Sequence, residues 1–210
     1  GYVQVSGSNG NYWGIGSTGG NNTPGTASTT LGFHRYNGSA WNNAVEIDTN
    51  GIITPDSGTG GIKLGGTAAA NLLDDYEEGT FQPTPSISGA TGAIAFKSAA
   101  DTLSYTKIGD LVHIQGYLQI DSNTVNGGRL NLGNLPFTSV DSAEASGYSL
   151  FTAQLSSGSG SQASGFFASI GEGLTLLQIQ TYTGVGTSNN SAVTMVADSF
   201  LFIQGQYKAA

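Results

Sequence analysis

The strongest constraint on the fold is the alternation of apolar and polar residues at positions 112–120, which read VHIQGYLQI. Successive side chains of a β-strand point to opposite faces of a sheet, so alternate positions share one face. The apolar positions are Val112, Ile114, Leu118 and Ile120, with Gly116 among them, and the other face carries His113, Gln115, Tyr117 and Gln119. Residues 111–120 are therefore predicted to form a strand with one buried face.

The rest of residues 80–210 repeats short apolar segments between turns rich in Gly, Ser and Asn. Only 10% of the residues are charged and 33 are Gly, which favours strands and turns over helices. Further strands are expected at 81–87, 93–96, 103–108, 129–132, 148–155, 165–170, 174–182, 193–196 and 200–207. This spacing predicts an antiparallel β-sandwich of the jelly-roll kind. Residues 200–203, FLFI, are apolar on both faces, as in a central strand or one at a subunit interface.

Residues 1–66 are predicted to form a separate β-rich stalk. Asn37-Gly38 is a strong hairpin signal between strands at 31–36 and 41–48, and Asn50-Gly51 marks a second turn. The region has too few large apolar residues to bury a core within one chain. We therefore expect an intertwined β-hairpin stalk in which three chains share one core.

Residues 67–79 are predicted to form a short helical junction between the stalk and a head domain at 80–210. Thr67 is a candidate N-cap and Gly79 a stop signal. At helical spacing one apolar face is formed, and it is expected to lie in a trimer interface: Ala69, Leu72, Leu73 and Tyr76. The opposite face is acidic and could bind a cation on a three-fold axis, although a solvated face is the preferred interpretation.

Charge and cysteine content exclude several classes of partner. The net charge is −8, with six Lys and Arg in all, so no basic surface for nucleic acid or anionic lipid is expected. No apolar run approaches the ~18–20 residues that a membrane-spanning helix needs. There is no Cys, which removes disulfides and Cys-metal sites. The first residue is Gly1, which suggests a fragment of a longer protein.

Catalytic and cofactor motifs are weak, and the chain is predicted not to be an enzyme. Residues 14–19 match GxGxxG but lack the strand-before, helix-after context of a dinucleotide site. The two histidines, His34 and His113, lie in expected strands without a serine-nucleophile motif. Paired carboxylates could cleave a glycan, and the candidates in the head are Asp121, Asp141, Glu144 and Glu172. Each lies in a turn-rich segment, where acidic residues are usually solvated. No cofactor or metal is expected.

Four segments, in order, resemble the C-terminal head domain of tail-fibre and related structural proteins of tailed bacteriophages. They are residues 73–84 (LDDYEEGTFQPT), 104–114 (SYTKIGDLVHI), 132–139 (LGNLPFTS) and 202–207 (FIQGQY). The resemblance covers residues 73–210. It implies a homotrimer located in the virion, made in the bacterial cytoplasm, joined to other virion proteins through a missing N-terminal part, and bound to a bacterial surface glycan or protein receptor.

Receptor binding is expected in three polar, almost uncharged segments, 121–128, 156–164 and 184–191. The candidate residues are Asn123, Asn126, Tyr148, Ser159, Gln162, Tyr182, Asn189 and Asn190. An acidic head would repel a polyanion, so a neutral or weakly cationic glycan is expected. Two alternatives stay open: a purely structural capsid or tail fibre or decoration protein, and a polysaccharide-degrading tailspike.

Overall fold

A computed structural model describes residues 2–6, 12–17, 30–55, 62–63, 72–73, 75–156, 165–182, 187–188 and 192–210. Within these residues the regular structure is β-strand, apart from two short 3-10 turns, η3 (Ala143–Ala145) and η4 (Ala192–Thr194). The chain divides into two compact units, residues 1–75 and residues 76–210, the second of which we call the head unit. The predicted all-β class is confirmed.

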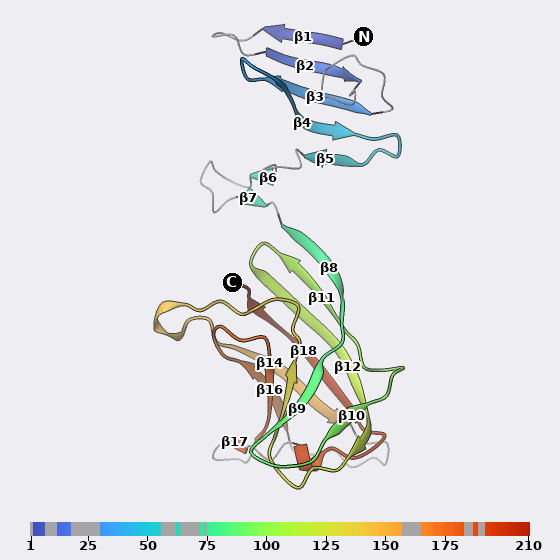
Figure 1. Cartoon of the computed structure of the whole chain (residues 1–210), viewed down its shortest axis with the longest axis vertical. Helices are drawn as coiled ribbons and strands as arrows, with labels where there is room; N and C mark the ends of the chain where they lie inside the picture. Colours follow the sequence, from blue (N-terminus) through green and yellow to red (C-terminus); the bar gives the residue numbers. More distant parts are fainter. Residues whose placement is uncertain are drawn as a thin grey trace. The chain divides into compact units, whose positions relative to one another are not determined.

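The first unit contains a five-stranded antiparallel sheet in which each strand pairs with the next in the chain (Figure 1). Its strands are β1 (Tyr2–Ser6), β2 (Tyr12–Ser17), β3 (Leu31–Tyr36), β4 (Trp41–Ile47) and β5 (Ile53–Pro55). At the predicted β3–β4 turn, the Asn37 side chain accepts hydrogen bonds from the Ser39 and Ala40 amides, both at 3.0 Å. Gly38 has φ +94°, which glycine adopts readily. The hairpin prediction is confirmed.

One face of this sheet is apolar and exposed. Val3 lies opposite Ile15 and Ile15 opposite Phe33, so these side chains form a row across β1, β2 and β3. All three are exposed, as are their apolar neighbours on the same face, Val5, Trp13 and Leu31. This observation agrees with the expectation that the region cannot bury an adequate core within one chain.

The predicted helix at 67–79 is wrong over the residues that the structure describes. Leu72–Leu73 is strand β7, which pairs with β6 (Ile62–Lys63), and Tyr76–Phe81 is strand β8. Residues 67–71, Ala69 included, and residue 74 lie outside the described part. A three-turn helix is marginal in water, whereas β8 pairs along its whole length with β11 (Leu103–Ile108). The helical face predicted from the spacing is therefore wrong: Leu73 is half-buried and Tyr76 is exposed, and the place of these residues in a trimer interface stays a prediction.

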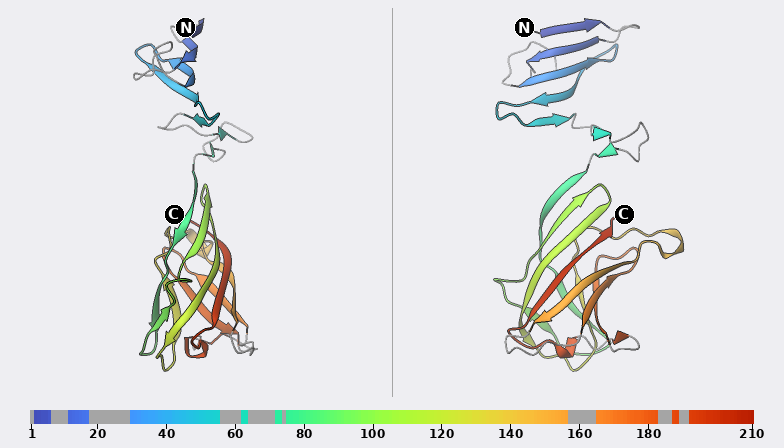
Figure 2. Two further views of the ribbon diagram at one scale, coloured as in Figure 1. Left: turned by 90° about the vertical axis from the view of Figure 1, so that its right-hand side faces the viewer. Right: turned by 180° about the vertical axis from the view of Figure 1, so that it is seen from behind.

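The head unit is built on one long antiparallel sheet in the order β8-β11-β12-β18-β14-β15-β16-β13-β9, with β10 paired to β12 and β17 to β16. The remaining strands are β9 (Thr84–Ser88), β10 (Ile94–Phe96), β12 (Leu111–Asn123), β13 (Arg129–Gly133), β14 (Ser149–Ser156), β15 (Phe166–Ile170), β16 (Leu177–Tyr182), β17 (Thr187–Ser188) and β18 (Phe200–Lys208). β8 and β9 are adjacent in the chain but stand at opposite ends of this order. The sheet therefore curls until its two edges approach, which gives a sandwich-like head unit (Figures 1 and 2).

The core fills the inside of this curled sheet. In β12 the four predicted inward residues, Val112, Ile114, Leu118 and Ile120, are fully buried. β18 lies between β12 and β14, which confirms the central position predicted for residues 200–203. Its apolar residues divide between the faces, however: Leu201 and Ile203 are buried, whereas Phe202 is exposed. The strand expected at 193–196 is wrong, because η4 occupies its start and Met195 fills the core from a turn.

Candidate functional site

Three aromatic rings gather on the outer face of the head unit, where β12 and β18 lie side by side. Tyr117 of β12 is directly opposite Phe202, and Phe200 lies two residues further along the same face of β18. The ring of Tyr117 is 5.6 Å from that of Phe202 and 5.7 Å from that of Phe200, between centroids. Tyr117 and Phe202 nevertheless keep 46% and 43% of their surface exposed. Large rings that pack together and still face solvent are suited to contact a partner.

A groove of about 460 Å³ opens beside these rings, and we call it the outer groove. Its lining residues are Ser104, Gln115, Gly116, Tyr117, Thr152, Gln154, Phe202, Ile203 and Gln204. A second depression of about 270 Å³ adjoins it, because the two share Ser104, Gln115, Gly116 and Tyr117. At Gly116 φ is +143° and a Cβ would lie 2.9 Å from Leu103 Cδ2, so glycine is required in this strand next to Tyr117.

Uncharged hydrogen-bonding groups form a row along the groove. Ser104, Gln115, Gln204 and Thr152 lie opposite one another on the four neighbouring strands β11, β12, β18 and β14. The Ser104 hydroxyl donates to the Gln115 carbonyl at 3.1 Å. Within the part of the chain that the structure describes, the side-chain amides of Gln115 and Gln204 and the Thr152 hydroxyl make no hydrogen bond. These groups are thus available to a ligand.

The outer groove is electrically neutral although the chain is acidic. Every lining residue of the larger depression is uncharged. The adjoining depression contains Asp101, whose carboxylate already accepts hydrogen bonds from the side chains of Gln82 and Thr102. These neutral donors stabilise the carboxylate but do not cancel its charge, so the negative charge near the groove lies in the adjoining depression and not in the larger one. The geometry therefore favours a neutral, hydroxyl- or amide-bearing ligand over a charged one.

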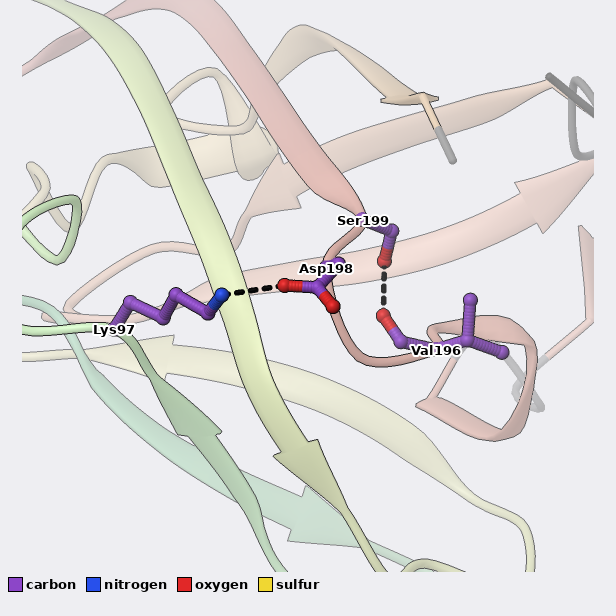
Figure 3. A network of polar contacts seen from close by, with 4 residues as sticks. All are labelled: Lys97, Val196, Asp198 and Ser199. Carbon is purple, nitrogen blue, oxygen red and sulfur yellow. Dashed lines mark hydrogen bonds and ion pairs between the residues drawn. The ribbon is translucent and has the colours of Figure 1, made fainter. Parts of the chain in front are cut away.

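Backbone hydrogen bonds hold the aromatic end of the groove, and one ion pair lies beside them. On one side of β12, the Lys97 amide donates to the Gln119 carbonyl, and on the other the Ile120 amide donates to the Ser199 carbonyl, both at 2.9 Å. The Lys97 ammonium pairs with the Asp198 carboxylate (Figure 3), and this hydrogen bond raises the pKa of Lys97. Both side chains are partly exposed, so the pair contributes little stability. The backbone bonds fix the strands beneath the rings.

Two of the residues predicted to bind receptor make hydrogen bonds within the head unit. The Asn123 side-chain amide donates to the carbonyls of Ala192 and Met195, and its oxygen accepts from the Val125 amide at 2.9 Å. The Asn126 side chain accepts a 3.3 Å hydrogen bond from the Thr91 amide. Both residues therefore hold loops together at one end of the head unit.

The other predicted residues do not gather into one site within the described part. Tyr148 is 64% exposed, but it precedes β14 at the end of the head unit opposite Asn123, as the β14–β18–β12 register shows. Tyr182 belongs to β16 and pairs with β17. Ser159, Gln162, Asn189 and Asn190 lie outside the described residues. Residues 121–123 are at the end of β12 remote from Tyr76, with which the head unit begins.

The carboxylates considered for glycan cleavage do not line the outer groove. Glu172 accepts hydrogen bonds from the Gly147 amide at 2.8 Å and the Ser142 amide at 3.3 Å, so it organises the loop that contains η3. Glu144 lies within η3, with φ +63°. The described residues contain no group of three or more His, Cys, Asp or Glu that could hold a metal ion. Among them there is also no helix long and apolar enough to cross a membrane.

Comparison with known proteins yields one structural similarity. No protein-family model and no curated protein matches the chain. The crystal structure of the Dettilon tailspike protein (gp208) matches with a TM-score of 0.53 and 15% sequence identity. The match covers 64% of this chain and 24% of the tailspike chain. At this identity the likeness concerns the fold.

The outer groove lies on the faces of strands, whereas the binding residues predicted from the sequence lie in or beside loops. The alternation in β12 does place Gln115 and Tyr117 on the outward face, and that was a usable signal. The position of Phe202 opposite Tyr117 depends on which strand pairs with β12. Pairing between strands some 90 residues apart in the chain is not encoded in local periodicity.

Proposed function

We propose that this chain is the adhesive part of a fibre or spike on a tailed-bacteriophage virion, and that it attaches the particle to a host-cell surface receptor. The observation that carries the proposal is the neutral, aromatic outer groove on a head whose fold is similar to that of a tailspike protein. The four sequence segments that resemble tail-fibre heads support the same role. Three of them contribute strands β8, β11, β12 and β18, which form a contiguous part of the sheet.

The proposed assembly of the chain is a homotrimer. The exposed apolar row of Val3, Ile15 and Phe33 supports this proposal, because an apolar sheet face of this kind is stabilised by burial against another surface. A second copy of the chain carries the same apolar face and can pack against it. In an assembly with closed symmetry, this face is covered in the same way in every copy.

The proposed role is binding without catalysis. The outer groove has no carboxylate in its lining, and Glu172 is engaged with backbone amides. Retaining and inverting glycosidases both need two carboxyl groups, about 5–10 Å apart, at the scissile bond. Incubation with host surface polysaccharide should therefore release no reducing ends above background, and release that is abolished by Asp121→Asn or Glu172→Gln would establish a tailspike enzyme instead.

Labelled protein provides the direct test of attachment. The purified full chain, carrying a fluorophore, should bind saturably to the bacterium on which the parent phage grows and much less to a resistant, receptor-deficient strain. Antibody against the chain should label tail fibres or spikes in electron micrographs of virions. Labelling of the capsid surface without any binding to cells would favour the decoration-protein alternative.

A further inference from the structure

We infer that the outer groove is the receptor-binding site and that its ligand is a neutral carbohydrate. The inference rests on the proposed function and adds to it the site and the chemical class of the ligand. The receptor contact then lies on the outward face of the β11–β12–β18–β14 sheet and not in the loops predicted from the sequence.

The aromatic cluster provides the apolar half of such a site. A pyranose ring has one face covered by C–H groups, which packs against aromatic rings, and hydroxyls at its edge that need hydrogen bonds. Tyr117 and Phe202 expose nearly half of their surface next to the groove, and Phe200 supports them from the side. Aromatic side chains lose little conformational entropy when they bind, so they are efficient contact residues.

The row of amides and hydroxyls provides the polar half. Gln115 and Gln204 face each other across β12 and β18, and each carboxamide offers two donors and an acceptor. The Thr152 hydroxyl continues the row on β14. These groups make no hydrogen bond within the described part of the chain, so a ligand would not have to displace internal partners.

The charge of the chain and of the groove lining, and the volume of the groove, restrict the class of ligand further. A polyanion would find no cation in the lining of the larger depression and would approach a chain of net charge −8. The groove volume of about 460 Å³ lies within the usual ~300–1,000 Å³ of ligand sites. The second depression extends the groove toward residues 98–102, which precede β11, and this length suits an oligosaccharide.

The test compares two groove variants with a control. Tyr117→Ala and Phe202→Ala each remove one exposed ring, whereas Leu111→Ala removes an exposed apolar side chain at the first residue of β12, outside the groove. Thr152→Trp is an independent variant that fills the groove without removing an aromatic contact. Thermal unfolding and mass measurements establish that each variant is folded and has the same assembly state as the wild type.

Binding is measured on immobilised neutral hexose and N-acetylhexosamine oligosaccharides, with uronate- and sialate-containing oligosaccharides beside them, and in parallel on host cells. We expect the wild type to bind at least one neutral oligosaccharide, and the two ring-removal variants and Thr152→Trp to lose tenfold or more of that affinity. Leu111→Ala should bind like the wild type.

Three results would overturn the inference: no neutral oligosaccharide bound, equal binding by the groove variants, or dissociation of the assembly by Tyr117→Ala and Phe202→Ala. The last result would make this face a contact between subunits. Cell binding by the wild type that persists in all groove variants would overturn the inference and leave the proposed function intact. Absence of wild-type binding to host cells would contradict the proposed function itself.

Discussion

At the residue scale, close contacts between strands explain why particular small residues occur in the head unit. Gly205 lies within the 202–207 segment of β18, opposite Phe151 of β14. A Cβ at Gly205 would lie 2.3 Å from Phe151 Cδ1 and 3.0 Å from Phe151 Cα. The glycine thus allows the phenylalanine ring to lie across β18 and reach Tyr207, 6.3 Å away between ring centroids.

Gly205→Ala should therefore destabilise the protein by about 1–3 kcal/mol, the usual cost of overpacking a core. Gly133→Ala is a matched control, because its Cβ would meet only the Thr84 carbonyl, at 3.6 Å. Chemical unfolding of the two variants and the wild type measures the difference. Equal stability of the two variants would show that Phe151 relaxes without cost.

Tyr207 links the end of β18 to the segment after β13. Its hydroxyl donates a 2.8 Å hydrogen bond to the Phe137 carbonyl, and burial raises the pKa of Tyr207 to about 12. In the unfolded chain the tyrosine ionises near pH 10. The folded protein then holds more protons than the unfolded chain as the pH rises, so stability should fall between about pH 10 and pH 12.

Tyr207→Phe should remove this part of the alkaline loss of stability and should cost about 1 kcal/mol at neutral pH through the lost hydrogen bond. Unfolding measured from pH 8 to pH 12 in both proteins provides the comparison. Parallel curves over the whole range would mean that Tyr207 is not the group responsible.

At the element scale, the turn between β4 and β5 is organised by one carboxylate. Asp48 accepts hydrogen bonds from the backbone amides of Ile52 and Asn50, both at 2.8 Å. The hydrogen bond from Ile52 and then that from Asn50 lower the pKa of Asp48. The contribution of this carboxylate to turn stability is therefore complete above the unfolded pKa near 4 and is lost as the pH falls through the lower folded value.

Asp48→Ala should loosen the β4–β5 hairpin at neutral pH and abolish the acid dependence of the turn. Hydrogen exchange of the Ile52 amide reports this directly, and the expected result is faster exchange in the variant. Asp48→Asn is the control, since it keeps an acceptor oxygen but has no charge to titrate. Unchanged Ile52 exchange in Asp48→Ala would show that Asp48 does not hold the turn.

The alternation of apolar and polar residues, together with the turn residues, predicted most strands of the head unit. Both features belong to the local sequence. The helix at 67–79 failed for a non-local reason: its Tyr76–Glu78 segment satisfies its backbone by pairing with β11. A local apolar pattern cannot detect that partner. For the same reason the outer groove could not be predicted from the local sequence. Its residues come from β11, β12, β14 and β18, and only the order of these strands in the sheet brings them together.

At the scale of the whole molecule, we expect an assembly of three chains. In solution the full chain should have a mass three times the 21.4 kDa of one chain. Ile15→Asp places a charge on the exposed apolar row of β1, β2 and β3, and burial of an unpaired charge costs several kcal/mol. The Ile15→Asp assembly should therefore dissociate at a higher protein concentration than that of Ser39→Asp, a control in the exposed β3–β4 turn. A wild-type mass of one chain at micromolar concentration would rule out the trimer.

Competition for adsorption tests the proposed adhesive role most directly. Host bacteria are preincubated with the purified full chain, the parent phage is added, and the rate at which free virions disappear is measured. Saturating wild-type protein should slow adsorption tenfold or more, Leu111→Ala protein should do the same, and Tyr117→Ala protein should not. Adsorption at the uninhibited rate in the presence of wild-type protein that has bound to the cells would contradict an adhesive role.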